Sequence, residues 1–450
     1  MAPAQGKPAF DLERTVGAAI DGARRRGVAD VKAVVVRSRS VSVTYRVGRP
    51  DKVEESARRA LSLYLYDGGR YTVCETNDLR EEALGRFLDS AAALLRATTP
   101  DPFREITDPA LYAGRVERAL GTHDPQVAAL TPEQRKRLAA RAEAAVLAAA
   151  GGAAVAAEAG FEDEESELFQ AHSNGFAAGK QGTRFGLYAE VSLADAGDKR
   201  PSDSELAATR AFAALPSPEA IGAGAAERAQ RKLGAAPMET STLPIIVENR
   251  AVGRLLGKLL AALGGRALQQ KQSFLAGALG SVVGSKILDI VDDPFVVGGA
   301  ASRLFDAEGI TARPLRLFAG GVLESYFFDT YYAKKLGQRP TTGGSSNVVV
   351  TPGDRSLAQL CADAGRGLLV RGFVGGNSNP TTGDFSLGVY GTLIENGAPT
   401  RAVAEMNISG NHKELWHKLA AAGNDPWPYG SLRSPSLLFD AVQLSGSGGV

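Results

Sequence analysis

The chain has 450 residues, of which 44% are hydrophobic and 22% charged, the balance of an ordinary globular protein. Its 51 basic and 50 acidic side chains leave a net charge of +1, so no overall charge attracts nucleic acid or an anionic membrane. No apolar run approaches the roughly 18 residues of a membrane helix, and residues 1–8 lack the apolar core of a signal peptide. We therefore expect a cytoplasmic protein, long enough for about two or three domains.

The first predicted segment, residues 1–100, is an α+β module. Its expected elements are a helix over 10–26, strands over 31–38, 40–47, 61–66 and 70–75, and a helix that opens at Asn77. The last two strands are separated by Asp67-Gly68-Gly69, a good hairpin signal. The proline-containing stretch 98–102 predicts a boundary.

The middle segment, residues 101–238, mixes helices and strands. Thr131 can cap a helix, Pro132 suits its first turn, and Gln134 completes a capping box. This helix is expected to run to about Ala150, and a second to run from Ser217 to about Gly234. Between them we expect strands over 153–162, 167–173 and 184–193. The acidic run within 162–167 is typical of a solvated face or a loop.

Residues 239–445 are predicted to form a domain dominated by curved antiparallel β-sheet. Expected strands cover 243–247, 315–318, 322–330, 367–373, 383–391, 392–395 and 403–408. Helices are expected over 249–263 and, more weakly, 354–364. Glycine pairs such as Gly375-Gly376 lack the spacing of phosphate-binding loops and indicate turns. Residues 446–450 are small and polar in composition and are expected to form a flexible tail.

Metal-ligating side chains are scarce. Cys74 and Cys361 belong to no Cys-x-x-Cys pair and are interpreted as buried small apolar residues. His412 and His417 are five positions apart, about 140° around a regular helix, so they would not face one metal. We interpret both as solvated or helix-end histidines.

The stretch 249–254 is the most informative part of the chain. An apolar strand-like run leads there into a helix, the place where a zinc peptidase carries a His-Glu pair and a second histidine. The corresponding residues are Asn249, Arg250 and Arg254. An amide is a very poor zinc ligand, and a guanidinium stays cationic and cannot act as a base. This pattern indicates a metal-free relative of a metalloenzyme.

Several segments, taken together in their order and spacing, resemble the TldD/TldE (PmbA) family of peptidases. They are 66–70, 76–79, 248–256, 271–275, 304–310, 321–326, 332–337, 382–386, 394–397, 408–411 and 423–425. In that family the catalytic TldD type carries His-Glu-x-x-x-His and a cysteine near the C-terminus. These motif positions fall here on Asn249, Arg250 and Arg254, and no cysteine follows Asp425. The resemblance is therefore to the TldE/PmbA type.

This resemblance implies a non-catalytic subunit that pairs with a TldD-type zinc peptidase in a heterodimer. The two chains would enclose a chamber for unfolded or modified peptides, with the zinc in the partner and no cofactor in this chain. The role would be in proteolysis, including peptide maturation. If Arg250 and Arg254 line the chamber, they would bind peptide carboxylates; otherwise they are ordinary helix-surface arginines.

Two other functions remain open from the sequence. One is a stand-alone peptide-binding scaffold that acts as a homodimer. The other is a hydrolase whose site has no recognisable motif, for which zinc content and peptidase activity of the isolated chain are the deciding measurements.

Overall fold

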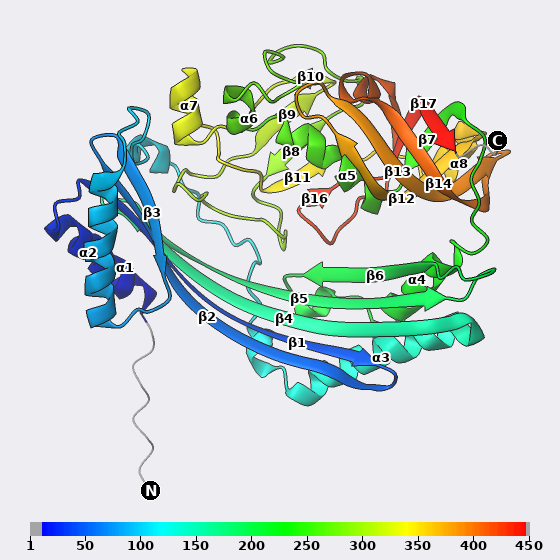
Figure 1. The fold of residues 1–450 in the computed structure, drawn as a ribbon, viewed down its shortest axis with the longest axis horizontal. Helices are drawn as coiled ribbons and strands as arrows, with labels where there is room; N and C mark the ends of the chain where they lie inside the picture. Colours follow the sequence, from blue (N-terminus) through cyan, green and yellow to red (C-terminus); the bar gives the residue numbers. More distant parts are fainter. Residues whose placement is uncertain (1–10, 447–450) are drawn as a thin grey trace, which may run out of the picture.

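Long antiparallel strands build the first half of the molecule. They are seen in a computed structural model that describes residues 11–446 (Figure 1). Six strands form one sheet in the order β3-β2-β1-β4-β5-β6. Their bounds are β1 Asp30–Arg46, β2 Arg49–Asp67, β3 Arg70–Thr76, β4 Ala154–His172, β5 Ala177–Leu193 and β6 Ser202–Thr209. Because β1 pairs with β4, the predicted first and middle segments share one continuous sheet.

Two pairs of helices cover different parts of this sheet. The helices α1 (Leu12–Arg25) and α2 (Glu81–Ala97) pack on β1 and β2 at one end, around a core of leucine, valine and alanine. The helices α3 (Pro132–Ala150) and α4 (Pro218–Gln230) share a second core with β4 and β5. The capping box predicted at Thr131 is confirmed: its hydroxyl accepts from the Gln134 amide, and the Gln134 side chain accepts from the Thr131 amide.

Three pairs of predicted strands are single strands in the structure. The strand β1 covers 31–38 and 40–46, and β4 covers 154–162 and 167–172. The strand β13 covers 384–391 and 392–395. The predicted breaks in β1 and β4 fall on polar residues, but neither centre has a glycine or proline, and pairing with β2 and β5 continues through both. The acidic run is thus part of β4. Glu165 is exposed as predicted, whereas Asp163, on the same face of the strand, is buried because Arg135 of α3 forms an ion pair with it.

The C-terminal domain contains two sheets over one large core. One sheet has the order β14-β13-β12-β7-β17-β15, and a further pairing of β14 with β17 closes five of these strands into a small barrel. The other has the order β10-β9-β8-β11-β16. Their bounds are β7 Ser241–Val247, β8 Ile290–Asp293, β9 Leu315–Ala319, β10 Val322–Leu323, β11 Asn347–Val350, β12 Gly367–Ser378, β13 Asp384–Glu395, β14 Ala398–Asn411, β15 Leu419–Ala422, β16 Leu432–Arg433 and β17 Leu437–Gly446. The predicted α+β class is confirmed, although two strand pairs, β7 with β12 and β11 with β16, are parallel.

Short helices connect these strands. They are α5 Asn249–Ala261, α6 Gly265–Gln269, α7 Thr330–Leu336, α8 Leu357–Ala364 and α9 His412–Leu415. The predicted strand over 322–330 was wrong in its length: β10 ends at Leu323, and α7 begins at Thr330 behind an Asp329 cap. Gly446 ends β17 by pairing with Met406, and the rest of the predicted tail, 447–450, lies outside the described residues. Within residues 11–446 no helix is long and apolar enough to cross a membrane.

The C-terminal domain faces the inner side of the curved N-terminal sheet, while α3 lies along the outer side (Figure 1). Polar contacts join the two halves: Lys32 Nζ donates to the Ala307 carbonyl at 3.0 Å, and Tyr331 Oη donates to Asp101 Oδ2 at 2.7 Å. The start of α5 lies where β6 meets the barrel, so the residues singled out by sequence are at a junction between domains.

Candidate functional site

The amide of Asn249 is fully engaged by its own chain. Asn249 is the first residue of α5, directly after β7 and Glu248. Its Nδ2 donates to the Asp425 carbonyl at 2.7 Å, and its Oδ1 accepts from the Arg250 amide at 2.7 Å. Its backbone amide donates to Ser436 Oγ at 3.1 Å, and Asp425 in turn accepts from Ser436. Asn249 therefore ties α5 to the segment before β17.

Arg250 is held between two parts of the molecule. Its Nη1 donates to Glu205 Oε2 at 2.6 Å, and its guanidinium lies 4.8 Å from the centre of the Trp427 ring. Burial, together with the nearby guanidinium of Arg228, lowers the pKa of Arg250. An arginine nevertheless remains cationic at any physiological pH, so this residue can bind anions but cannot accept a proton.

Arg254 is exposed, unlike Asn249 and Arg250. Its Nη2 lies 3.3 and 3.4 Å from the carbonyls of Gly375 and Gly376. These glycines form a bulge in β12 rather than a terminal turn, since the register with β13 shifts there. Gly376 has a φ of +89°, and a Cβ at this position would lie 2.4 Å from the Ser386 carbonyl, so only glycine fits. The long contacts leave the guanidinium of Arg254 free to bind a ligand.

The residues at the three motif positions do not fit a zinc ion. They supply one engaged amide and two cations, and each of the three has different partners. Zinc requires imidazole, thiolate or carboxylate ligands. Among the described residues, no three His, Cys, Asp or Glu side chains are grouped as a metal site requires. No zinc chemistry can therefore be derived from these side chains.

A buried ionic network lies beside the start of α5, and sequence reasoning did not find it. Glu248 accepts from Arg371 at 2.6 Å and lies 3.4 Å from Arg228. Asp203 lies 3.1 Å from Lys232 and 3.6 Å from Arg228. Burial disfavours the charge of Arg228, but the carboxylates of Glu248 and Asp203 outweigh this and raise its pKa. These residues lie in or directly after β6, α4, β7 and β12, which are separate segments of the sequence, so no local motif predicts the network.

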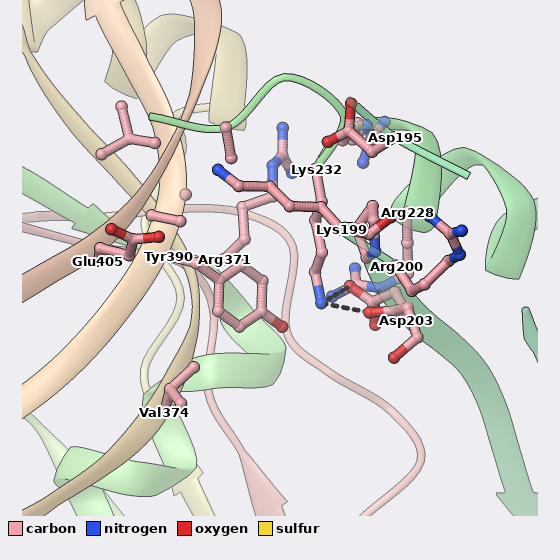
Figure 2. Close-up of a pocket in the computed structure, with 17 residues that line it drawn as sticks. Asp195, Lys199, Arg200, Asp203, Arg228, Lys232, Arg371, Val374, Tyr390 and Glu405 are labelled. Carbon is pink, nitrogen blue, oxygen red and sulfur yellow. Dashed lines mark hydrogen bonds and ion pairs between the residues drawn. The ribbon is translucent and has the colours of Figure 1, made fainter. Parts of the chain in front are cut away.

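The network forms one wall of a cavity of about 380 Å³ between the middle segment and the barrel (Figure 2). The barrel contributes Tyr390 and Val374, and the loop between β5 and β6 contributes Lys199 and Arg200. Figure 2 shows these side chains together with Arg228, Lys232 and Arg371 around the same space. The volume is near the lower end of the range of about 300–1,000 Å³ that is usual for small-ligand sites.

Comparison with known proteins shows what class this fold and site define. Profiles of three PmbA/TldA metallopeptidase domains match in order: domain 1 over residues 31–95, the central domain over 125–233 and the C-terminal domain over 240–446. The chain belongs to the PmbA/TldD metallopeptidase family.

Within this family the chain is PmbA/TldE-like. It is 30% identical to Metalloprotease PmbA of Escherichia coli O157:H7, covering 97% of this chain and 96% of that protein. It is 28% identical to the PmbA homologue of Haemophilus influenzae, covering 99% and 100%. A crystal structure from Bacteroides thetaiotaomicron, described as a candidate modulator of DNA gyrase, is 35% identical with a TM-score of 0.94, covering 96% and 98%. TldE from Thermococcus kodakarensis, at 21% identity, a TM-score of 0.86 and coverage of 96% and 100%, shares the fold.

Proposed function

We propose that this chain is the non-catalytic, TldE/PmbA-like subunit of a heterodimeric zinc peptidase. Its partner would be a TldD-type chain that carries the zinc, and this chain would hold no cofactor of its own. It would complete the chamber in which unfolded or modified peptides are cut. The cytoplasmic location expected from the sequence remains a prediction.

One observation carries the proposal: the three motif positions are occupied by side chains that are chemically unable to bind zinc or accept a proton. Both Nδ2 and Oδ1 of Asn249 are hydrogen-bonded within the chain, and Arg250 is paired with Glu205. Hydrolysis at a zinc site needs an open metal position and a carboxylate that takes a proton from the bound water. This supports the proposal that such chemistry comes from another polypeptide.

Of the two arginines predicted to bind substrate, Arg254 has the geometry to do so. It is exposed and makes only long contacts to carbonyls, whereas Arg250 is half-buried and already neutralised by Glu205. A planar guanidinium can bind a carboxylate through two parallel hydrogen bonds. We assign Arg254 to contact with acidic peptide groups, and the prediction for Arg250 stays untested.

The decisive experiment is co-expression with a TldD-type chain that has an intact His-Glu-x-x-x-His motif. We expect a complex of one copy of each chain in solution, zinc bound only when the partner is present, and peptidase activity only in the complex. A partner whose motif glutamate is changed to glutamine should still form the complex but lack activity. One tightly bound zinc per isolated chain, with chelator-sensitive peptidase activity, would refute the proposal.

A further inference from the structure

We propose that the cavity between α4, the loop before β6 and the barrel binds the terminal carboxylate of a short peptide with an apolar last side chain. The class of ligand, a peptide, rests on the proposed function. The site itself rests on the charges and shape of the cavity. It lies beside the network of Glu248 and is distinct from the exposed guanidinium of Arg254.

Positive charge exceeds negative charge in the lining of this cavity. The cationic residues are Lys199, Arg200, Arg228, Arg231, Lys232 and Arg371, and the acidic ones are Asp195, Asp203 and Glu405. The six cations against three carboxylates leave an excess of three positive charges, of which Glu248 behind the wall and Glu227, the partner of Arg231, offset two. An anion entering the cavity therefore meets a favourable field.

Two of these cations are available at the mouth. Within residues 11–446 no carboxylate forms an ion pair with Lys199 or Arg200. Arg200 donates only to the carbonyls of Gly197 and Lys199. Both side chains lie on the exposed loop between β5 and β6, and Figure 2 shows them on the same side of the cavity as Asp203 and Arg228. They can rearrange to meet a ligand without breaking an existing ion pair.

Two of the three acidic residues of the lining are paired with other groups of the chain. Asp203 is shared by Lys232 and Arg228, and Asp195 accepts from the backbone amides of Ala196 and Gly234. Nε of Arg228 is buried and has no acceptor at hydrogen-bond distance among the described residues; it lies 3.6 Å from Asp203 Oδ1, within reach of an ion pair.

The rest of the lining is apolar, which favours a carboxylate with an apolar body over a small inorganic anion. Tyr390 presents its ring, with Lys232 Nζ 4.0 Å from the ring centre, and Val374, Val403 and Ala235 complete this side. Glu405 lies at the rim with a φ of +57°, where β14 bulges against β13. A non-glycine residue in this conformation is costly, and such strain often marks a functional site.

Calorimetric titration of the isolated chain with N-acetyl-Ala-Leu tests the proposal. We expect saturable binding of one peptide per chain, and no measurable binding of the same dipeptide with a C-terminal carboxamide. The double substitution Lys199→Ala/Arg200→Ala should raise the dissociation constant about tenfold or more, as loss of charge-assisted hydrogen bonds does. Both residues are exposed loop residues, so the variant should fold, and its melting temperature checks this. The matched control is Lys286→Ala, an exposed lysine outside the cavity, which should leave binding unchanged.

Three outcomes of the titrations would overturn the inference, and a competition experiment gives a fourth. They are no binding of the free acid, equal binding of the carboxamide, or an affinity that the double substitution leaves unchanged. Inorganic phosphate serves as a competitor, and if it displaced the peptide fully at equal concentration, the cavity would be a phosphate site instead. The test is independent of the proposed function. A chain that binds the dipeptide but forms no complex with a TldD-type partner would refute the proposed function alone. A chain that forms the complex but does not bind the dipeptide would refute this inference alone.

Discussion

Arg250 Nη1 donates to Glu205 Oε2 at 2.6 Å, and this ion pair joins α5 of the C-terminal domain to β6 of the N-terminal sheet. The two side chains are only 15% and 19% exposed, and Trp427 covers the guanidinium. The position that corresponds to the proton acceptor in TldD-type chains thus holds a cation that links two domains. A glutamate at this position would place two carboxylates against each other.

Arg250→Glu should lower the free energy of unfolding by about 3 kcal/mol, because it removes the partner of a mostly buried carboxylate and adds a like charge. The charge swap Arg250→Glu/Glu205→Arg should recover part of this loss. Recovery should be incomplete because the contact with Trp427 is also lost. Urea unfolding of the two single variants and the swap measures the coupling. If the loss of unfolding free energy in the swap equals the sum of the losses in the two single variants, the ion pair contributes nothing to stability.

Arg254→Ala, with a TldD-type partner present, should raise KM for an acidic peptide several-fold and leave kcat unchanged, since uniform binding is lost. Arg254→Lys should raise KM less than Arg254→Ala does but should not keep the original value, because an ammonium cannot form two parallel hydrogen bonds to a carboxylate. Lys258→Ala, an exposed cation one turn further along α5, is the matched control. An unchanged KM for Arg254→Ala would exclude contact between this arginine and the substrate.

Asp163→Ala should destabilise the fold by about 3–5 kcal/mol, because it leaves the buried guanidinium of Arg135 without its partner. The two side chains are 2% and 4% exposed, and Asp163 Oδ1 accepts from Arg135 Nη2 at 2.9 Å. Glu165→Ala, two residues further along β4 on an exposed side chain, should change stability by less than about 0.5 kcal/mol. Chemical denaturation of both variants checks this. Equal effects would mean that the acidic run acts as one solvated face.

Protonation of His412 should destabilise the protein in mild acid. Its ring lies between Phe274 and Phe385, at 5.4 and 5.0 Å between ring centres, and neither ring nitrogen has a hydrogen-bond partner among residues 11–446. Burial, with a smaller contribution from Lys258, lowers the pKa of His412 to about 4. Above a pH of about 6.5 the imidazole is neutral in both states; between about 6.5 and 4 only the unfolded chain takes up the proton, so stability falls as pH falls.

From pH 7.5 to pH 5 this residue should contribute about 2 kcal/mol of the loss in unfolding free energy. His412→Phe should remove that part of the pH dependence. Another part should remain, because burial lowers the pKa of His172 to about 3 and acts in the same direction. Unfolding by urea at the two pH values measures the difference, with the exposed His417→Gln as control. If His412→Phe kept the full pH dependence, the neutral buried imidazole would not be its source.

Local signals in the sequence were sufficient for several elements. The capping box at Thr131, the Asp67-Gly68-Gly69 turn and the apolar spacing of α1 each depend on residues a few positions apart, and each element has the predicted type and nearly the predicted bounds. The family also follows from the order of residues in the sequence. That Asn249, Arg250 and Arg254 are poor zinc ligands follows from the sequence too, because ligand chemistry is a property of the side chain itself.

Tertiary structure alone decided how these parts meet. Residues 49–60 at the start of β2 are rich in charged side chains and mostly exposed, and their apolar residues do not alternate with polar ones. They form a strand because their backbone pairs with the edge of β1. His412 was expected at a helix end, which is correct, but its burial depends on Phe274, far away in the sequence. The network of Glu248, Arg228 and Arg371, and the cavity beside it, combine residues more than a hundred positions apart. The sequence shows which of these residues are charged. Which of them pair depends on how two domains pack, and this cannot be predicted from the spacing of residues along the chain.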